Sequence, residues 1–207
     1  MIISFEGLDG CGKSTQIIKL KEYLERSGKK VKILREPGGN SISEKIRDIL
    51  LDKKNLNMTN ETELLLYIAS RAQLVREEII PLLDDGIIVL LDRFIDSTTA
   101  YQGYGREMDT DLINRLNLFA THNGVYFPDL TFFIDLDPRI SLNRINTRGE
   151  ELNRMEAVKF EFFEKIYKGF NEIRDKNPDR IVRIDGSSSP DNVFDKVKLE
   201  VTERLNL

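Results

Sequence analysis

The sequence of 207 residues has a single cysteine, Cys11. A lone cysteine cannot form a disulfide within the chain, so the sequence favours a reducing compartment, and we expect a cytoplasmic protein. The sequence also lacks a basic excess, because 35 Asp and Glu residues outnumber 31 Lys and Arg residues. Nucleic-acid-binding proteins usually carry such an excess, so we expect no nucleic-acid partner.

Long apolar runs, repeats and low-complexity segments are missing too. Apolar runs such as Ile87–Leu91 are far too short to cross a bilayer, so we expect no membrane partner. The remaining composition, 40% hydrophobic and 32% charged, is typical of a globular chain that is large enough to bury a core. We therefore expect one domain over residues 1–207.

Five short apolar runs, each bounded by turn residues, predict strands. They are mostly continuous rather than alternating, which is typical of strands buried on both faces. The predicted strands are Ile2–Glu6, Lys30–Glu36, Gly86–Asp92, Asp129–Leu136 and Arg180–Gly186. Amphipathic stretches between them predict helices at Lys13–Gly28, Glu61–Leu83 and Asn153–Asp175. This alternation predicts an α/β fold with a parallel sheet covered on both faces, whose ligands bind beyond the carboxyl ends of the strands.

The loop after the first predicted strand fits the pattern G-x-x-x-x-G-K-[ST] through Gly7, Gly12, Lys13 and Ser14. Glycines let successive N–H groups point at one phosphate, and the following helix adds its positive dipole end. Lys13 would reach the β- and γ-phosphates, and the Ser14 hydroxyl would bind Mg²⁺. A glycine-rich turn that binds nothing is the alternative, but the strand-to-helix context favours a phosphate-binding loop (P-loop). The predicted ATP-binding residues are Gly7, Leu8, Asp9, Gly10, Cys11, Gly12, Lys13, Ser14 and Thr15.

The third predicted strand narrows the reaction. It ends at Asp92, the carboxylate expected near Mg²⁺, and the next residue is Arg93. An arginine cannot accept a proton from water, so Arg93 suits a second anion better than a hydrolytic reaction. A guanine-reading Asn-Lys-x-Asp segment is also missing from the sequence. These residues indicate phosphoryl transfer onto an acceptor that already bears phosphate.

Beyond the P-loop, four stretches make the chain resemble thymidylate kinases, which are P-loop nucleoside monophosphate kinases. They are "REPGG" (Arg35–Gly39), "SRAQ" (Ser70–Gln73), "LDRFIDSTTAYQG" (Leu91–Gly103) and "RGEELNRME" (Arg148–Glu156). The resemblance implies a three-layer P-loop NTPase fold with a five-stranded parallel sheet and a short helical lid at about 139–156. It also implies transfer of the γ-phosphoryl group of ATP to dTMP, giving dTDP and ADP for dTTP synthesis, with Mg²⁺ and in a homodimer.

The resemblance also assigns roles at the acceptor site. Asp9 would accept a hydrogen bond from the sugar 3′-OH, Arg35 would hold the acceptor phosphate, and Tyr101 would crowd the 2′ position. Tyr67 would stack on the base, and Arg71 would contact either a thymine carbonyl or the phosphate. Thr98 and Gln102 would read the base edge. The full predicted dTMP set is Asp9, Arg35, Glu36, Pro37, Tyr67, Arg71, Arg93, Thr98, Tyr101 and Gln102.

The lid would supply positive charge to the transferring group. Some thymidylate kinases carry an arginine where this chain has Gly10, so the charge must come from elsewhere. Arg144, Arg148 and Arg154 are the predicted lid arginines, and Arg148 resembles the lid arginine of the class that lacks the P-loop arginine. Solvated helix faces remain the alternative for each. The predicted catalytic residues are Lys13, Arg93 and Arg148, and the predicted Mg²⁺ ligands are Ser14 and Asp92.

Two other functions remain open on the residues alone. A kinase for another acceptor, either a nucleoside or a different monophosphate, would share the P-loop. Three positive charges at Arg35, Arg71 and Arg93 favour an acceptor that carries phosphate. A non-catalytic nucleotide-binding regulator is the second alternative. The intact Lys13 and Asp92 and the lid arginines favour an enzyme instead.

Overall fold

The computed structural model describes residues 1–147, 149, 153–156 and 160–205. One parallel sheet lies at its centre, with strand order β2-β3-β1-β4-β5. The strands are β1 (Ile2–Glu6), β2 (Val31–Arg35), β3 (Ile88–Asp92), β4 (Leu130–Asp135) and β5 (Ile181–Asp185). The prediction of a five-stranded parallel sheet is confirmed, with each strand within two residues of its expected ends.

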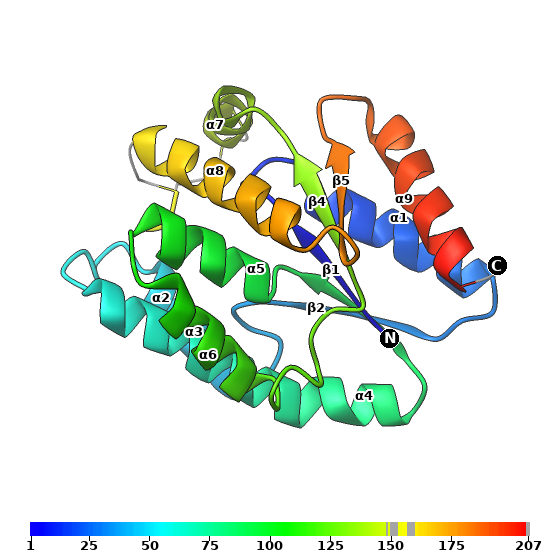
Figure 1. Ribbon diagram of the computed structural model, residues 1–207, viewed down its shortest axis with the longest axis horizontal. Coiled ribbons are helices and arrows are strands. Elements are labelled where there is room, and N and C mark those ends of the chain that lie inside the picture. The colour runs from blue at the N-terminus through cyan, green and yellow to red at the C-terminus, as the bar shows by residue number, and fades with distance from the viewer. Residues whose placement is uncertain (148, 150–152, 157–159, 206–207) are drawn as a thin grey trace.

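Helices cover both faces of this sheet and give three layers (Figure 1). Their bounds are α1 (Lys13–Arg26), α2 (Ser41–Leu51), α3 (Asn60–Leu74), α4 (Ile80–Asp84), α5 (Ile95–Thr98), α6 (Thr110–Ala120), α7 (Pro138–Thr147), α8 (Phe160–Lys176) and α9 (Pro190–Leu205). Two π-helical segments, η1 (Val75–Ile79) and η2 (Thr99–Gly105), continue α3 and α5. Helices α1 and α9 lie on one face, and α8 lies on the other (Figure 1). Among the described residues, no helix combines the length and apolar character that a bilayer span requires.

The packing of the core explains why the strand sequences are continuous apolar runs. Successive side chains of a strand point to opposite faces. In β1, Ile3 and Phe5 pack with Leu20 and Leu24 of α1, whereas Ile2 packs with Leu74 at the end of α3. All of β1 is buried. Apart from Ser4, whose hydroxyl is paired with that of Thr131 on β4, the strand is apolar until Glu6 at the ligand edge.

Several predicted helix boundaries need correction. The single helix predicted at Glu61–Leu83 is divided into α3, η1 and α4, and α8 begins at Phe160 rather than at Asn153. Gly28 lies one residue beyond the C-cap of α1 and has a φ of 78°, a left-handed conformation that glycine adopts without strain. Three further helices, α2, α6 and α9, were not predicted, whereas α7 lies within the short helical lid expected at about 139–156.

Candidate active site

The P-loop curls around the start of α1. Gly7, Gly10 and Gly12 have φ values of 135°, 75° and 100°, which an L side chain rarely adopts. Lys13 folds back over the loop, and its Nζ donates hydrogen bonds to the carbonyl oxygens of Gly7 (3.2 Å) and Leu8 (2.9 Å). The ammonium group is therefore held at the centre of the loop, where a phosphate would lie.

A candidate metal site lies beside the P-loop. The Ser14 hydroxyl donates to Asp92 Oδ2 at 2.9 Å, so a hydroxyl from α1 and a carboxylate from the end of β3 meet. Both line a cleft of about 370 Å³ together with Lys13, Arg35 and Arg93. Magnesium prefers oxygen ligands and usually binds through one or two protein groups plus substrate phosphates. Ser14 and Asp92 fit that chemistry.

A second, narrower cleft of about 100 Å³ joins the first. Nine of the ten residues predicted to bind dTMP line it, and the tenth, Arg35, lines the P-loop cleft instead. The nine are Asp9, Glu36, Pro37, Tyr67, Arg71, Arg93, Thr98, Tyr101 and Gln102. Asp9, Glu36, Arg47 and Arg93 line both clefts. We call the second one the acceptor cleft.

Arg93 and Asp9 form an ion pair where the two clefts meet. Arg93 Nη2 donates to Asp9 Oδ1 at 2.7 Å, and Nη1 donates to the Gly7 carbonyl at 2.9 Å. The Tyr101 hydroxyl donates to the other oxygen of Asp9 at 3.1 Å. Burial by itself would raise the pKa of Asp9, but the charges of Arg93 and Lys13 outweigh it and lower this pKa to about 2. Asp9 is therefore an acceptor-only carboxylate at neutral pH.

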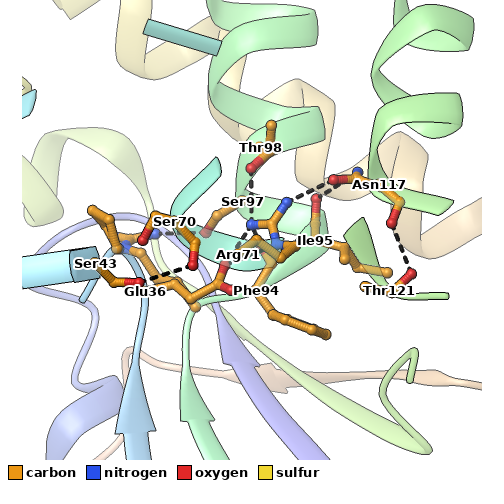
Figure 2. Close-up of polar contacts among 12 residues, drawn as sticks. Glu36, Ser43, Ser70, Arg71, Phe94, Ile95, Ser97, Thr98, Asn117 and Thr121 are labelled. Atoms are coloured by element: carbon orange, nitrogen blue, oxygen red, sulfur yellow. Dashed lines mark hydrogen bonds and ion pairs between the residues drawn. The ribbon is translucent and has the colours of Figure 1, made fainter. Parts of the chain in front are cut away.

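Arg71 lies at the inner end of the acceptor cleft and is only 1% exposed (Figure 2). Its Nε and Nη2 both donate to Glu36 Oε2, at 2.9 and 2.5 Å. Nη1 donates to Asn117 Oδ1 at 2.6 Å, and Nη2 also donates to the Phe94 carbonyl and to Thr98 Oγ1, each at 3.0 Å. The guanidinium is thus fixed by partners from four segments of the chain.

Glu36 balances the charge of Arg71 inside this apolar surrounding. Burial raises the pKa of Glu36, and the charge and hydrogen bonds of Arg71 oppose that rise. Its second oxygen, Oε1, is buried and has no hydrogen-bond partner among the described residues. One acceptor oxygen of the pair therefore lacks a partner among the described residues, although both side chains line the cleft.

The three predicted lid arginines have different surroundings. Arg144 of α7 is exposed and its Nη1 donates to the Gly10 carbonyl at 3.1 Å, next to the P-loop. Arg154 is 8% exposed, pairs with Glu63 at 2.7 Å and donates to the Leu50 carbonyl at 2.7 Å. Arg154 lines neither cleft. Arg148 lies outside the described residues.

Arg47 and Ser97 are two of the cleft residues that were not predicted. Arg47 of α2 lines both clefts and donates to the Pro37 carbonyl at 2.9 Å. Asn40 caps α2 by accepting from the Ser43 N–H at 2.8 Å, so an Asn at this N-cap position was the available signal for the helix that carries Arg47. Ser97 of α5 lines the acceptor cleft and accepts from Arg93 Nη1 at 3.0 Å. No sequence pattern pointed to Ser97.

Comparisons with known proteins identify the family of the chain. The family model described as thymidylate kinase matches residues 5–197. Thymidylate kinase from Thermosipho melanesiensis is 47% identical over 206 residues, which cover 100% of both chains. Thymidylate kinase from Chlorobaculum tepidum is 46% identical over 205 residues, covering 95% of this chain and 94% of that protein. The crystal structure of thymidylate kinase from Ehrlichia chaffeensis is similar with a TM-score of 0.76 and 36% identity, covering 99% of this chain and 98% of that one.

Proposed function

The chain belongs to the thymidylate kinase family and catalyses the ATP-dependent phosphorylation of dTMP to dTDP, and we propose that its two joined clefts hold the two substrates. ATP lies on the P-loop, with its terminal phosphate pointing towards the acceptor cleft. The observation that carries this proposal is the Arg93–Asp9 pair, because it stands where the two clefts meet.

The phosphate groups meet among fixed positive charges. Lys13 neutralises the β- and γ-phosphates. Ser14 and Asp92 would hold Mg²⁺, which would supply Lewis-acid neutralisation of phosphate charge. Arg93 and Arg35 hold the dTMP phosphate for in-line attack. Phosphoryl transfer needs positioning and charge neutralisation more than covalent help. Arginines suit this role because they cannot lose their proton at physiological pH.

The residues at the inner end of the acceptor cleft recognise the base. Arg71 donates to a thymine carbonyl, since its burial beside Glu36 keeps it away from the phosphate end. Thr98 and Gln102, four residues apart, present a hydroxyl and an amide to the base edge, and Tyr67 stacks on the ring. A stacking aromatic contributes about 1–3 kcal/mol per base. Glu36 and Pro37 close the wall of the cleft.

The sugar lies between the base and the phosphate. Asp9 accepts a hydrogen bond from the 3′-OH, which an ionised carboxylate with a low pKa does well. Tyr101 crowds the 2′ position and so disfavours ribonucleotides. Its hydroxyl already donates to Asp9, so the ring is held in place before substrate binds.

The segment 139–156 closes over the clefts as a lid in this single domain. Arg144 already contacts the P-loop through Gly10, and Arg148 is the second arginine proposed to approach the transferring group, whereas Arg154 pairs with Glu63 away from both clefts. An arginine that neutralises transition-state charge can raise the rate by about 10³–10⁵. The lid therefore supplies the charge that the glycine at position 10 cannot.

A coupled ADP-release assay tests this assignment. ATP and Mg²⁺ are supplied with dTMP, dUMP, dCMP, dGMP, UMP or thymidine as acceptor. We expect release to be strongest with dTMP, weak with UMP and absent with thymidine. Equal rates with dCMP would contradict the base-reading residues. Arg93→Ala should remove most turnover while ATP binding persists, and a near-normal rate in this variant would contradict the role of Arg93.

We further propose that two copies of the chain form a homodimer through the face of α3 and α6. These helices contact one another, and exposed apolar side chains gather there at Leu65 (57% exposed), Leu112 (39%) and Phe119 (75%). Phe119→Asp should shift the sedimentation coefficient towards a monomer. Leu199→Asp, on the distant helix α9, is the control that should leave it unchanged (Figure 1). A monomer in both the parent protein and the control would refute the dimer.

A cytoplasmic location is also part of the proposal. Its support is the lone buried Cys11, which forms no disulfide within the described structure and is stable in a reducing compartment. Fractionation of cells that express the tagged protein tests this location. A signal confined to the membrane or secreted fraction would contradict it.

A further inference from the structure

Arg93 has an unusual backbone conformation. Its φ of 69° lies in the left-handed region, which non-glycine residues adopt at a cost of about 1–3 kcal/mol. Such a conformation persists only where the surroundings fix it. Two bonds to β1 do so here, because the Arg93 N–H donates to the Phe5 carbonyl at 3.1 Å and the Phe94 N–H donates to Glu6 Oε1 at 2.7 Å.

The Glu6 carboxylate, which accepts the hydrogen bond from the Phe94 N–H, is also connected to the Arg93 side chain through Ser97. Glu6 is fully buried at the end of β1, and its Oε2 accepts a short hydrogen bond from the Ser97 hydroxyl. Ser97 Oγ in turn accepts from Arg93 Nη1 at 3.0 Å. Glu6, Ser97 and Arg93 therefore form a continuous series of hydrogen bonds. Glu6 lines neither cleft, so it can influence the substrates only through its partners.

We propose that Glu6 and Ser97 are positioning residues that orient the Arg93 guanidinium for phosphoryl transfer. This inference rests on the role of Arg93 proposed above. Glu6 fixes the backbone on one side of Arg93 and, through Ser97, one nitrogen of its guanidinium. The Gly7 carbonyl and Asp9 fix the rest of that group. The strained residue is thus held by its backbone and its side chain together.

Glu6 affects the orientation of Arg93 because it determines which groups donate and which accept in these hydrogen bonds. An ionised carboxylate can only accept hydrogen bonds, so the single hydrogen of the Ser97 hydroxyl is donated to Glu6. The lone pairs of Ser97 Oγ then face Arg93. A protonated carboxyl or an amide at position 6 could donate to Oγ instead. The serine hydrogen would lose its fixed acceptor, and the orientation of Arg93 would be less defined.

The charge of Glu6 changes near neutral pH. Burial raises the pKa of Glu6 to about 7, and repulsion from Asp96 adds to this rise. The hydrogen bond from Ser97, the charge of Arg93 and the N–H of Phe94 oppose it. Arg180, which forms an ion pair with Asp96 at 2.7 Å, also faces this cluster, and Asp9 faces it on the Arg93 side. As pH falls through 7, Glu6 gains a proton and can itself donate a hydrogen bond. The Ser97 hydroxyl then no longer has one fixed acceptor for its hydrogen.

A matched pair of variants isolates the Ser97 hydroxyl. Ser97→Thr keeps it, Ser97→Val has nearly the same shape without it, and both are β-branched. One lost hydrogen bond corresponds to about a tenfold change in rate. We therefore expect kcat for Ser97→Val to be about tenfold below that for Ser97→Thr, with the KM for ATP within about twofold. If neither variant folds, Ser97→Ala compared with Glu6→Gln serves instead.

Two further measurements separate positioning from a purely structural role. In an Arg93→Ala background, Ser97→Thr and Ser97→Val should have the same residual kcat, since the group they orient is gone. Glu6→Gln should lose the part of the kcat profile that titrates near pH 7. The dTMP phosphate also titrates near pH 6, but it does so in every variant, so the comparison with the parent protein isolates Glu6.

The possible outcomes distinguish this inference from the proposal on which it rests. A near-normal rate for Arg93→Ala would refute the role of Arg93 itself. If Arg93→Ala is impaired but Ser97→Thr and Ser97→Val have equal kcat values, Arg93 matters and the positioning inference is wrong. A difference that persists in the Arg93→Ala background would also overturn the inference, because it would assign Ser97 to the general stability of α5.

Discussion

Glu36 accepts two hydrogen bonds from Arg71 through a single oxygen, and both side chains are buried at the inner end of the acceptor cleft (Figure 2). Two opposite charges removed from water are tolerable only as a pair, and the loss of one leaves the other uncompensated. The same pair lines the cleft where the thymine base is proposed to bind. Stability and base recognition are therefore linked at this point.

Glu36→Gln should consequently weaken both properties. The uncompensated Arg71 should lower the free energy of unfolding by about 3–5 kcal/mol. The KM for dTMP should rise more than the KM for ATP, because only the acceptor cleft changes. Urea unfolding and steady-state kinetics measure these effects.

Glu44→Gln is the matched control for that variant. Glu44 pairs with Arg35 at 2.9 Å, but its side chain is 38% exposed. Exposed ion pairs contribute about 0–1 kcal/mol, so this change should be small. Equal destabilisation by the two substitutions would contradict the importance of burial for the Glu36–Arg71 pair.

The metal site gives a second prediction. Asp92→Asn removes the negative charge beside Ser14, so the concentration of Mg²⁺ needed for half-maximal activity should rise by about tenfold or more. A titration of activity with Mg²⁺ at fixed ATP measures the shift. Asp85→Asn makes the same chemical change at an exposed position before the other end of β3 and should leave the curve in place. Identical curves for Asp92→Asn and the parent protein would remove Asp92 from the metal site.

Glu6 gives a prediction for stability as well as for rate. Its pKa is about 7 in the folded protein against an ordinary value of 4.5, so the fold favours the protonated form. The free energy of unfolding should therefore fall as pH rises from about 4.5 to 7, with a contribution of about 3 kcal/mol from this carboxyl. Activity has the opposite preference, because orientation of Arg93 uses the ionised form. Glu6 would then favour function at the expense of stability, as strained active sites often do.

Unfolding free energies at pH 5 and pH 8 check this sign. Glu6→Gln has no charge at either pH, so its stability should change less between these two values than that of the parent protein. Ser97→Ala keeps the carboxyl and is the control that should retain most of the dependence. A larger decline in Glu6→Gln than in the parent protein would show that another group is responsible.

The sequence was most informative where local chemistry determines structure. The P-loop pattern requires glycines at fixed positions, and continuous apolar strands require two covered faces, so the sheet and Lys13 were predictable. The helices between them were less so. Asp96 lies in the first turn of α5, where an aspartate is typical of a helix start, but its carboxylate binds Arg180, and Phe94 occupies the N-cap position. An ion pair between residues 84 positions apart has no local signature.

The hydrogen-bond and ion-pair partners of the site residues were also not predictable from the sequence. From the sequence, Glu6 is predicted only to end a strand, and the fold brings it next to Ser97, 91 positions later. Arg154 lies in a predicted lid, yet it is buried against Glu63 of α3. Residue types and spacing can indicate which groups face the substrates. They cannot show which neighbours hold those groups, because that depends on how separate elements pack.

The contact between the P-loop and α7 leads to the last prediction. Gly10 has a φ of 75°, and a Cβ built on it would lie 3.2 Å from the Ser141 carbonyl oxygen and 3.3 Å from Arg144 Cβ. A larger side chain at position 10 would therefore press against α7, so this loop cannot carry its own arginine without displacing the helix. Positive charge has to approach from α7 and the lid instead, and Arg144 already donates to the Gly10 carbonyl.

Arg144→Ala should accordingly lower kcat by about tenfold, the effect of one lost charge-assisted contact. Arg139→Ala is the control on the same helix, since Arg139 is exposed. Its kcat should stay within about twofold of the parent value, as for most surface substitutions. Gly10→Arg should not rescue Arg144→Ala, because the left-handed backbone and the nearness of α7 leave the new side chain no relaxed position. Rescue by that substitution would show that the P-loop and the lid can exchange this role in the chain.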